Sequence, residues 1–189
     1  MSQIEVEIIA LGRVLDEGRG SLPFALVHGE ALVTCATWAL SEAGVLPLDA
    51  RTTMEGVRDA ELPLVLHDSL CPMTPPDFIA ECVRRAVADG VVVAGFRPVT
   101  DTVKVLRGNT LGETVDRDAL ARVTSPVVVP ADRVDGAAAL LSDPGIDLAA
   151  LVEALRADGQ VVLLEAPPEA MRVSGPHDVR VLEALTRPV

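Results

Sequence analysis

Apolar residues along the chain follow two spacings, and their alternation predicts strands that are followed by helices. Short apolar runs typical of buried strands occupy residues Glu5–Leu11, Leu62–His67, Val91–Phe96, Val123–Val129 (divided by Pro126) and Gln160–Leu164. Apolar residues three and four apart predict helices at Gly29–Ala43, Phe78–Val87, Asp132–Leu141, Asp147–Gly159 and Ser174–Leu185. This order predicts a single α/β domain over residues 1–189, with a Rossmann-like, mainly parallel, doubly wound sheet.

Turn and cap residues refine this outline. Thr74 is a candidate N-cap for the second helix, because Pro75 and Pro76 suit a first turn and Asp77 completes a capping box. The turn Arg107-Gly108-Asn109 lies between two short apolar runs and predicts a hairpin at Thr102–Leu106 and Thr110–Val115. Asp49–Glu61 is polar and predicts a connection with one weak element at most.

Ligands in doubly wound sheets bind beyond the carboxyl ends of the strands. Four connections qualify here, and the first is a Gly-rich loop: Gly12–Gly20, His67–Pro72, Arg97–Thr102 and Ala166–Ser174. Candidate site residues are therefore expected in these segments.

The composition excludes several classes of binding partner. The net charge is -12 and no basic run occurs, so a nucleic-acid partner is not expected. No apolar run reaches the ~18 residues of a membrane helix. Met1–Ala10 has no charged leader and contains Glu5 and Glu7, and the three cysteines lack a disulfide or zinc spacing. We expect a cytoplasmic protein with reduced thiols and no membrane partner.

Four segments, in order, carry a resemblance to a known family: His67-Asp68-Ser69-Leu70-Cys71-Pro72, Pro98-Val99-Thr100-Asp101-Thr102-Val103-Lys104, Thr114-Val115-Asp116-Arg117, and Met171-Arg172-Val173-Ser174-Gly175-Pro176-His177-Asp178. Together they resemble the 2-C-methyl-D-erythritol 4-phosphate cytidylyltransferase family. The resemblance covers about Leu62–Leu185. It implies a protruding β-arm at about residues 100–118, through which two identical subunits exchange arms.

The resemblance also implies a reaction and the residues for it. A cytidylyl group passes from CTP to methylerythritol phosphate, a sugar phosphate, with Mg²⁺, and pyrophosphate leaves, as part of non-mevalonate isoprenoid biosynthesis. By the same resemblance, Arg172 and Asp68 are catalytic, and Asp68 is also a candidate substrate and metal ligand. Thr102 and Arg117 would bind the substrate phosphate of the partner subunit. Positive charge at such positions stabilises phosphoryl transfer. The resemblance and the loop together point to Gly12, Arg13 and Ser69 as candidates for the nucleotide.

The Gly-rich loop departs from the family pattern. Phe24 stands where the family has a lysine after proline, while Asp16 and Glu17 lie where a triphosphate favours cations. Arg13 or Arg19 could compensate for the missing charge. A Gly-Gly-x-x-Arg-x-x-Ser segment, which reads cytosine in the family, is shortened to Asp49–Glu61, and Cys71 replaces a family arginine. These departures leave a second hypothesis open, a catalytically inactive homologue that binds a sugar phosphate or regulates a dimer partner.

Structural roles compete with these assignments. Asp68 could cap the loop after its strand, His67 could be a hydrogen-bonded structural histidine, and Arg172 could form a surface ion pair. Arg117 could serve the arm alone, and Gly12 could be an ordinary loop glycine. A third hypothesis, a different nucleotide-sugar transferase, needs a metal-binding carboxylate pair that the sequence does not present.

Overall fold

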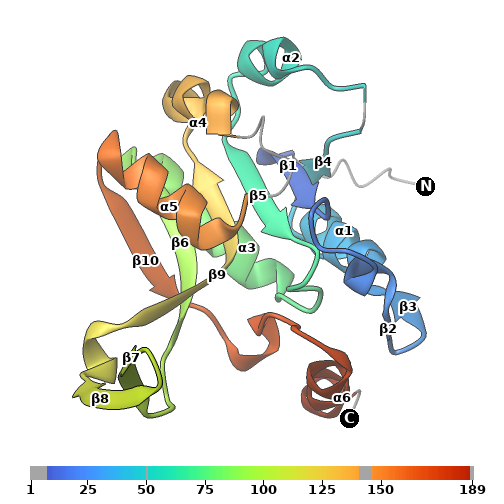
Figure 1. Ribbon diagram of the computed structural model, residues 1–189. Helices are drawn as coiled ribbons and strands as arrows, with labels where there is room; N and C mark the ends of the chain where they lie inside the picture. The colour runs from blue at the N-terminus through green and yellow to red at the C-terminus, as the bar shows by residue number, and fades with distance from the viewer. Residues whose placement is uncertain (1–7, 50, 141–145, 188–189) are drawn as a thin grey trace.

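The structure, a computed structural model, describes residues 8–49, 51–140 and 146–187. Its centre is a sheet whose strands lie in the order β10-β6-β9-β5-β1-β4 from edge to edge (Figure 1). These strands are β1 (Ala10–Leu15), β4 (Val45–Pro47), β5 (Leu64–Asp68), β6 (Val92–Pro98), β9 (Ala121–Val129) and β10 (Val161–Glu165). Only the β9 pairings, with β5 and β6, are antiparallel within this described sheet. The predicted mainly parallel α/β fold is therefore confirmed.

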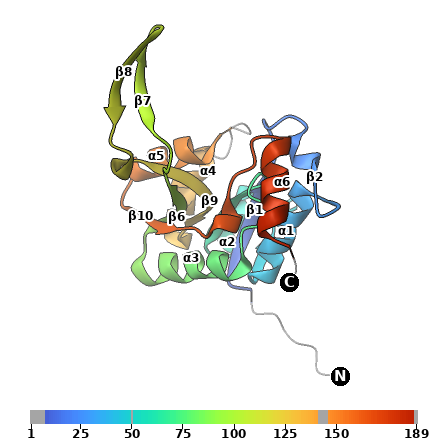
Figure 2. The ribbon, with the colours of Figure 1, turned by 90° about the horizontal axis from the view of Figure 1, so that it is seen from below.

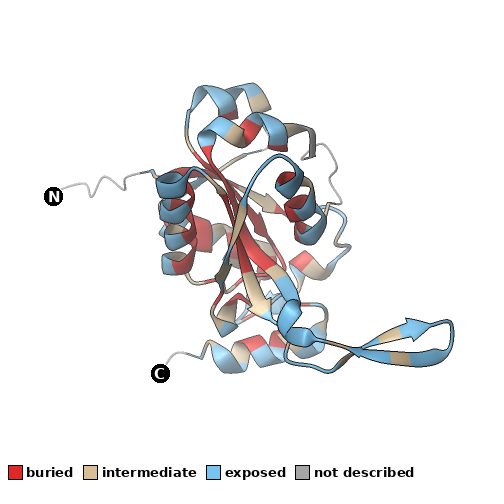
Figure 3. Ribbon diagram, turned by 90° about the vertical axis from the view of Figure 1, so that its left-hand side faces the viewer, coloured by how far each residue is buried: buried red, intermediate tan, exposed pale blue. Residues whose placement is uncertain are grey.

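Helices cover both faces of the sheet (Figure 3). Apolar side chains of α1 (Leu32–Glu42) and α3 (Pro76–Asp89) pack with Val65, Val93 and Val128 on one face. Those of α5 (Leu148–Ala157), with α4 (Val134–Leu140) and α2 (Met54–Asp59), pack with Leu64, Leu66 and Val127 on the other. Alternate residues of one strand thus enter opposite cores, as the period of two in a strand requires.

A third, smaller cluster lies beside the carboxyl ends of the strands. There α6 (Pro176–Leu185) packs on the two-stranded β2 (Leu26–Val27) and β3 (Glu30–Ala31), which follow the short helix η1 (Leu22–Phe24). Further short helices are η2 (Arg117–Ala119), η3 (Ala131–Arg133) and η4 (Pro168–Ala170). This cluster packs the segments after β1 and β10 against each other beside the carboxyl edge of the sheet.

The predicted hairpin is also confirmed. Strands β7 (Val103–Arg107) and β8 (Thr110–Val115) pair with each other and project away from the domain (Figure 2). Leu106 and Leu111 on this hairpin are 67% and 68% exposed. Within the described chain, β7 and β8 form a sheet of their own.

The first strand lies later in the chain than predicted. The part of Glu5–Leu11 before residue 8 lies outside the described residues, and β1 continues through Gly12 to Leu15. The prediction of a loop from Gly12 was wrong, because this glycine is needed for packing. A Cβ at Gly12 would lie 2.6 Å from Val45 Cγ1. The Gly-rich loop therefore begins only at Asp16.

Three local predictions need correction. The structure places β4 where no strand was expected, and it starts directly after α1. Pro126 does not divide β9, which continues through a cis Ser125–Pro126 bond opposite a register shift in β6. Thr74 is not the N-cap of α3, because Pro75 holds that position and the Thr74 hydroxyl donates to the Cys71 carbonyl.

Within the described residues, no helix combines the length and the apolar character needed to cross a membrane. Cys35, Cys71 and Cys82 are free thiols, and the last two are buried.

Candidate active site

Two arginines from distant parts of the chain converge on one carboxylate at the carboxyl edge of the sheet. Asp68 is the last residue of β5 and lies opposite Leu15, the last residue of β1. Its carboxylate accepts from Arg19 Nε at 2.8 Å and from Arg172 Nε at 3.0 Å. The Leu70 amide also donates to it at 3.0 Å. The loop after β1, the end of β5 and the segment before α6 are thus joined at a single point.

Asp68, Arg19 and Arg172 are called the charged cluster below, and their side chains differ in exposed fraction. The Asp68 and Arg19 side chains are 1% and 5% exposed, whereas that of Arg172 is 38% exposed. Arg19 makes further bonds to the carbonyls of Glu17 at 2.6 Å and Ile146 at 3.5 Å. Two guanidinium groups share one carboxylate, so the cluster carries an excess of one positive charge. Such a charge at a strand end favours an anionic ligand.

Arg172 has donors to spare. Its Nε is bonded to Asp68, while its terminal Nη groups donate to no residue that the structure describes. Asp68 therefore fixes the orientation of the guanidinium and leaves the outer donors available. A fixed, half-exposed guanidinium is suited to bind a phosphate through two hydrogen bonds.

Two buried polar residues, Ser125 and His67, lie beside Asp68, and Ser125 bonds to both the Asp68 backbone and the His67 ring. Ser125 Oγ accepts from the Asp68 amide at 3.0 Å and lies 2.5 Å from His67 Nδ1. His67 is fully buried, and burial lowers its pKa to about 4, with Asp68 opposing the shift. Its Nε2 has no hydrogen-bond partner among the described atoms. His67 is therefore a neutral structural residue at pH 7, in agreement with the structural interpretation of the sequence.

Cys71 is not placed as a nucleophile. Burial, followed by the charge of Asp68, raises the pKa of its thiol to about 11. Its sulfur lies 3.4 Å from Thr124 Oγ1, and the His67 ring is bonded to Ser125 instead. The residue that replaces the family arginine therefore fills the core beneath the site.

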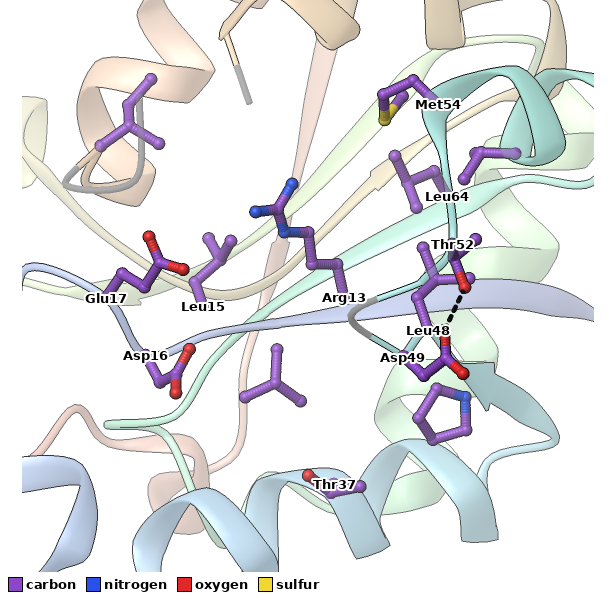
Figure 4. A pocket seen from close by; sticks show the side chains of 14 residues that line it. Arg13, Leu15, Asp16, Glu17, Thr37, Leu48, Asp49, Thr52, Met54 and Leu64 are labelled. Carbon is purple, nitrogen blue, oxygen red and sulfur yellow. Dashed lines mark hydrogen bonds between the residues drawn. The ribbon is translucent and has the colours of Figure 1, made fainter. Parts of the chain in front are cut away.

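An open pocket of about 320 Å³ lies beside β1 (Figure 4). Glu17 and Ile146 connect it to the charged cluster, because both residues line the pocket and their carbonyls accept from Arg19. Charged and hydroxyl side chains in the lining are Arg13, Asp16, Glu17, Thr37, Asp49 and Thr52. This size suits a small organic ligand.

The three residues predicted to bind the nucleotide differ in their position relative to the pocket. Arg13 lines the pocket. Ser69 does not, since it is buried and its hydroxyl donates to the Leu15 carbonyl at 2.9 Å. Gly12 lies one residue before Arg13, and the space beside it is filled by Val45 and Leu40. Of the three, only Arg13 is placed to touch a ligand in this pocket.

Thr102 and Arg117 lie at the base of the hairpin, apart from the cluster. Both are exposed, and Arg117 donates to the Thr100 carbonyl at 2.6 Å. Neither residue is part of the pocket lining, and the bonds described for Asp68 come from other residues. Their predicted role in a partner's site stays a prediction.

Sequence reasoning ranked one member of the cluster too low. Arg19 was only one of two candidates to replace a missing lysine, yet it makes the shortest bond to Asp68. The signal in the sequence was the pair of glycines, Gly18 and Gly20, that flank Arg19. In the structure both have positive φ, of 73° and 60°, a conformation that favours glycine. Thr37 and Asp49 of the pocket had no distinguishing signal in the sequence.

Known proteins share both the motifs and the fold. A family model described as 2-C-methyl-D-erythritol 4-phosphate cytidylyltransferase matches residues 50–187, which include Asp68, the hairpin and Arg172. The chain belongs to this family. The matched residues lie after the Gly-rich loop, so the family match rests on the segments that also carried the sequence resemblance.

Relatives with that name agree with the assignment. The Frankia casuarinae protein is 34% identical over 183 residues, which are 95% of this chain and 68% of that protein. The Saccharopolyspora erythraea protein is 33% identical over 130 residues, or 68% of this chain. This chain spans only 57% of the latter's length, and 64% of that of the Corynebacterium diphtheriae relative.

The crystal structure of the cytidylyltransferase from Thermus thermophilus has the same fold, with a TM-score of 0.72 at 20% identity. The match covers 94% of this chain and 98% of that one. The Rossmann-like, mainly parallel architecture of the family is thereby established for this chain.

The predicted metal ligand does not fit Mg²⁺ as it is arranged. Both Asp68 oxygens already accept from guanidinium groups, and Mg²⁺ requires free oxygen ligands in an octahedral arrangement. Across residues 8–49, 51–140 and 146–187, no group of three His, Cys, Asp or Glu side chains could hold a metal ion. No chemical step is therefore assigned to a metal on Asp68.

Proposed function

We propose that this chain catalyses cytidylyl transfer from CTP to methylerythritol phosphate. The observation that carries the proposal is the convergence of Arg19 and Arg172 on Asp68 beside an open pocket. Family membership and the names of the relatives support the same reaction. It would place the chain in isoprenoid biosynthesis.

The cluster suits the charge changes of the reaction. A phosphate oxygen of the sugar phosphate attacks the α-phosphorus of CTP, the bond from that phosphorus to the bridging oxygen breaks, and pyrophosphate leaves. Negative charge grows on the oxygens around the α-phosphorus and on the leaving group. Asp68 holds Arg172 at Nε, and the outer nitrogens of Arg172 donate to no described residue. In the proposed reaction these nitrogens would donate to the oxygens around the α-phosphorus. Arg19 adds a second positive charge that Asp68 holds in place.

The test is pyrophosphate release by the whole protein with CTP and methylerythritol phosphate, with and without Mg²⁺. We expect Arg172→Ala to lower kcat by roughly 100-fold or more, the cost of losing one preorganised donor. Arg180→Ala is the matched control, because Arg180 is an exposed arginine on α6. Absence of release from the unmodified protein with CTP would contradict the proposal.

The hairpin supports a homodimeric arrangement in which sites are shared. Its projecting strands expose Leu106 and Leu111, and Arg117 at its base is bonded to the Thr100 carbonyl, away from the site of its own subunit. We expect a dimer in light scattering that Leu106→Asp with Leu111→Asp dissociates. Arg117→Ala and Arg172→Ala should each have low activity. Mixing the two variants should restore part of the activity, because one mixed site then holds both native arginines. No recovery would mean that the arm does not complete a partner's site.

A second candidate function is binding without turnover. Asp16 and Glu17 line the pocket, and Phe24, at the position of the family lysine, is 64% exposed. These residues favour an inactive homologue that binds a sugar phosphate and regulates its dimer partner. Such a protein would be stabilised by methylerythritol phosphate in a thermal shift assay yet release no pyrophosphate from any nucleoside triphosphate.

A further inference from the structure

Arg13 occupies an unusual place for a charged residue. It lies on β1 between Leu11 and Leu15, and both of these leucines belong to the buried core on that face of the sheet. The period of two in a strand sends the Arg13 side chain to the same face. Figure 4 shows it reaching from β1 toward the residues that line the pocket.

This guanidinium has no partner in the part of the chain that the structure describes. Among those residues, the Arg13 side chain forms no hydrogen bond and no ion pair, and the residue is only partly exposed. Its planar donors are therefore available to a ligand. A partly buried, unpaired guanidinium is costly for the free protein, so a ligand with acceptor atoms at that position would recover part of the cost.

The charge around Arg13 decides which part of a nucleotide it meets. The described pocket lining contains one cation, Arg13, and three anions, Asp16, Glu17 and Asp49. The neighbouring cluster contains two cations and one anion. A triphosphate would be repelled from the pocket and attracted to the cluster, while a neutral heterocycle with both donors and acceptors is compatible with the pocket. This arrangement favours the base in the pocket and the phosphates toward Arg172.

We propose that Arg13 is a specificity-determining residue that reads the nucleobase and makes the pocket select cytosine over uracil. The inference rests on the proposed function, for which CTP is the donor. Cytosine presents two adjacent acceptors, O2 and N3, which a guanidinium can engage with two parallel hydrogen bonds. Its N4 amine can donate to a carboxylate of the lining. In uracil N3 carries a hydrogen and the fourth position an oxygen, so a donor would face Arg13 and an acceptor would face the carboxylates.

The connection Asp49–Glu61 also forms part of the pocket. It contributes Asp49, Thr52, Met54 and Val57 to the lining. Asp49 is tied within this connection, since it accepts from the Arg51 amide at 2.8 Å and from the Thr52 hydroxyl at 3.0 Å. Within the described lining, Arg13 on β1 is the residue that offers a guanidinium to a base.

Calorimetric titration of the whole protein with CTP and with UTP tests the inference. We expect the unmodified protein to bind CTP roughly 10- to 100-fold more tightly than UTP, the range for one bidentate base contact. Arg13→Gln should lower CTP affinity to the level of UTP and leave UTP affinity within a few-fold. Unchanged UTP affinity shows that the variant is folded. Arg51→Gln is the control, because Arg51 is an exposed arginine near the pocket that does not line it.

The outcomes separate this inference from the proposed function. Equal affinities for CTP and UTP in the unmodified protein, or a preference that survives Arg13→Gln, would overturn the role of Arg13 even if pyrophosphate is released. A cytosine preference that Arg13→Gln removes, in a protein that releases no pyrophosphate, would support the role of Arg13 and contradict cytidylyl transfer. Retention of the preference in Arg51→Gln is also required.

Discussion

Replacement of Asp68 by asparagine should destabilise the protein more than any exposed charge substitution. Asparagine has nearly the same shape but removes the negative charge that two guanidinium groups share. Arg19 is the decisive partner, because its side chain is 5% exposed and would keep an uncompensated buried charge. Such a loss costs about 3–5 kcal/mol. Arg172 is 38% exposed, so solvent screening limits its share to about 1 kcal/mol or less.

Urea denaturation at pH 7, followed by circular dichroism, measures this difference. A domain of this kind has ~5–15 kcal/mol of stability, so Asp68→Asn should shift the midpoint strongly while the slope stays constant. Arg172→Met should lose about 1 kcal/mol or less. Asp135→Asn is the control, since its ion pair with Arg58 is formed by a side chain that is 76% exposed, and little change is expected. A loss below about 1 kcal/mol for Asp68→Asn would refute the claim that Asp68 neutralises a buried Arg19.

Three further predictions concern other residues. The pKa of His67 is about 4 in the folded protein against an ordinary value of 6.5, so its contribution is complete above pH 6.5 and is lost as the pH falls toward 4. From pH 7 to pH 5 the free energy of unfolding of the unmodified protein should therefore fall by about 2 kcal/mol more than that of His67→Phe. An equal fall in the two proteins would contradict this. Gly12→Ala should cost ~1–3 kcal/mol through overpacking against a neighbouring valine methyl. Thermal melts measure this loss, and Gly175→Ala, which has open space around it, should be neutral in them. Burial raises the pKa of Cys71 to about 11, so a thiol reagent at pH 8 should modify the half-buried Cys35 first, and rapid labelling of Cys71 in the folded protein would count against this.

Local patterns were sufficient for most of the elements. The predicted stripe of α3 comprised Phe78, Ile79, Cys82, Val83, Ala86 and Val87. The first five are buried, whereas Val87 is 59% exposed, so the prediction was wrong for that residue. Asp147 predicted the start of α5, and its side chain does accept from the Ala150 amide. The predicted ends of strands were wrong where contacts with residues distant in the sequence decide them. The sequence predicted Gly12 to be a loop residue. It belongs to a strand instead, where Val45 and Leu40 fill the space that a side chain would need.

In the site too, some features follow from local sequence and others depend on contacts between distant residues. Periodicity, composition and motif order specified the α/β fold, the family and the candidates Asp68 and Arg172, because each depends on residues close together in the sequence. Only the tertiary structure selected Arg19 over Arg13 as the partner of Asp68 and turned Arg13 into the pocket. Arg19 and Arg172 are 49 and 104 positions from Asp68, respectively. Charge neutralisation at such separations depends on which strand ends lie side by side, and no local pattern encodes that.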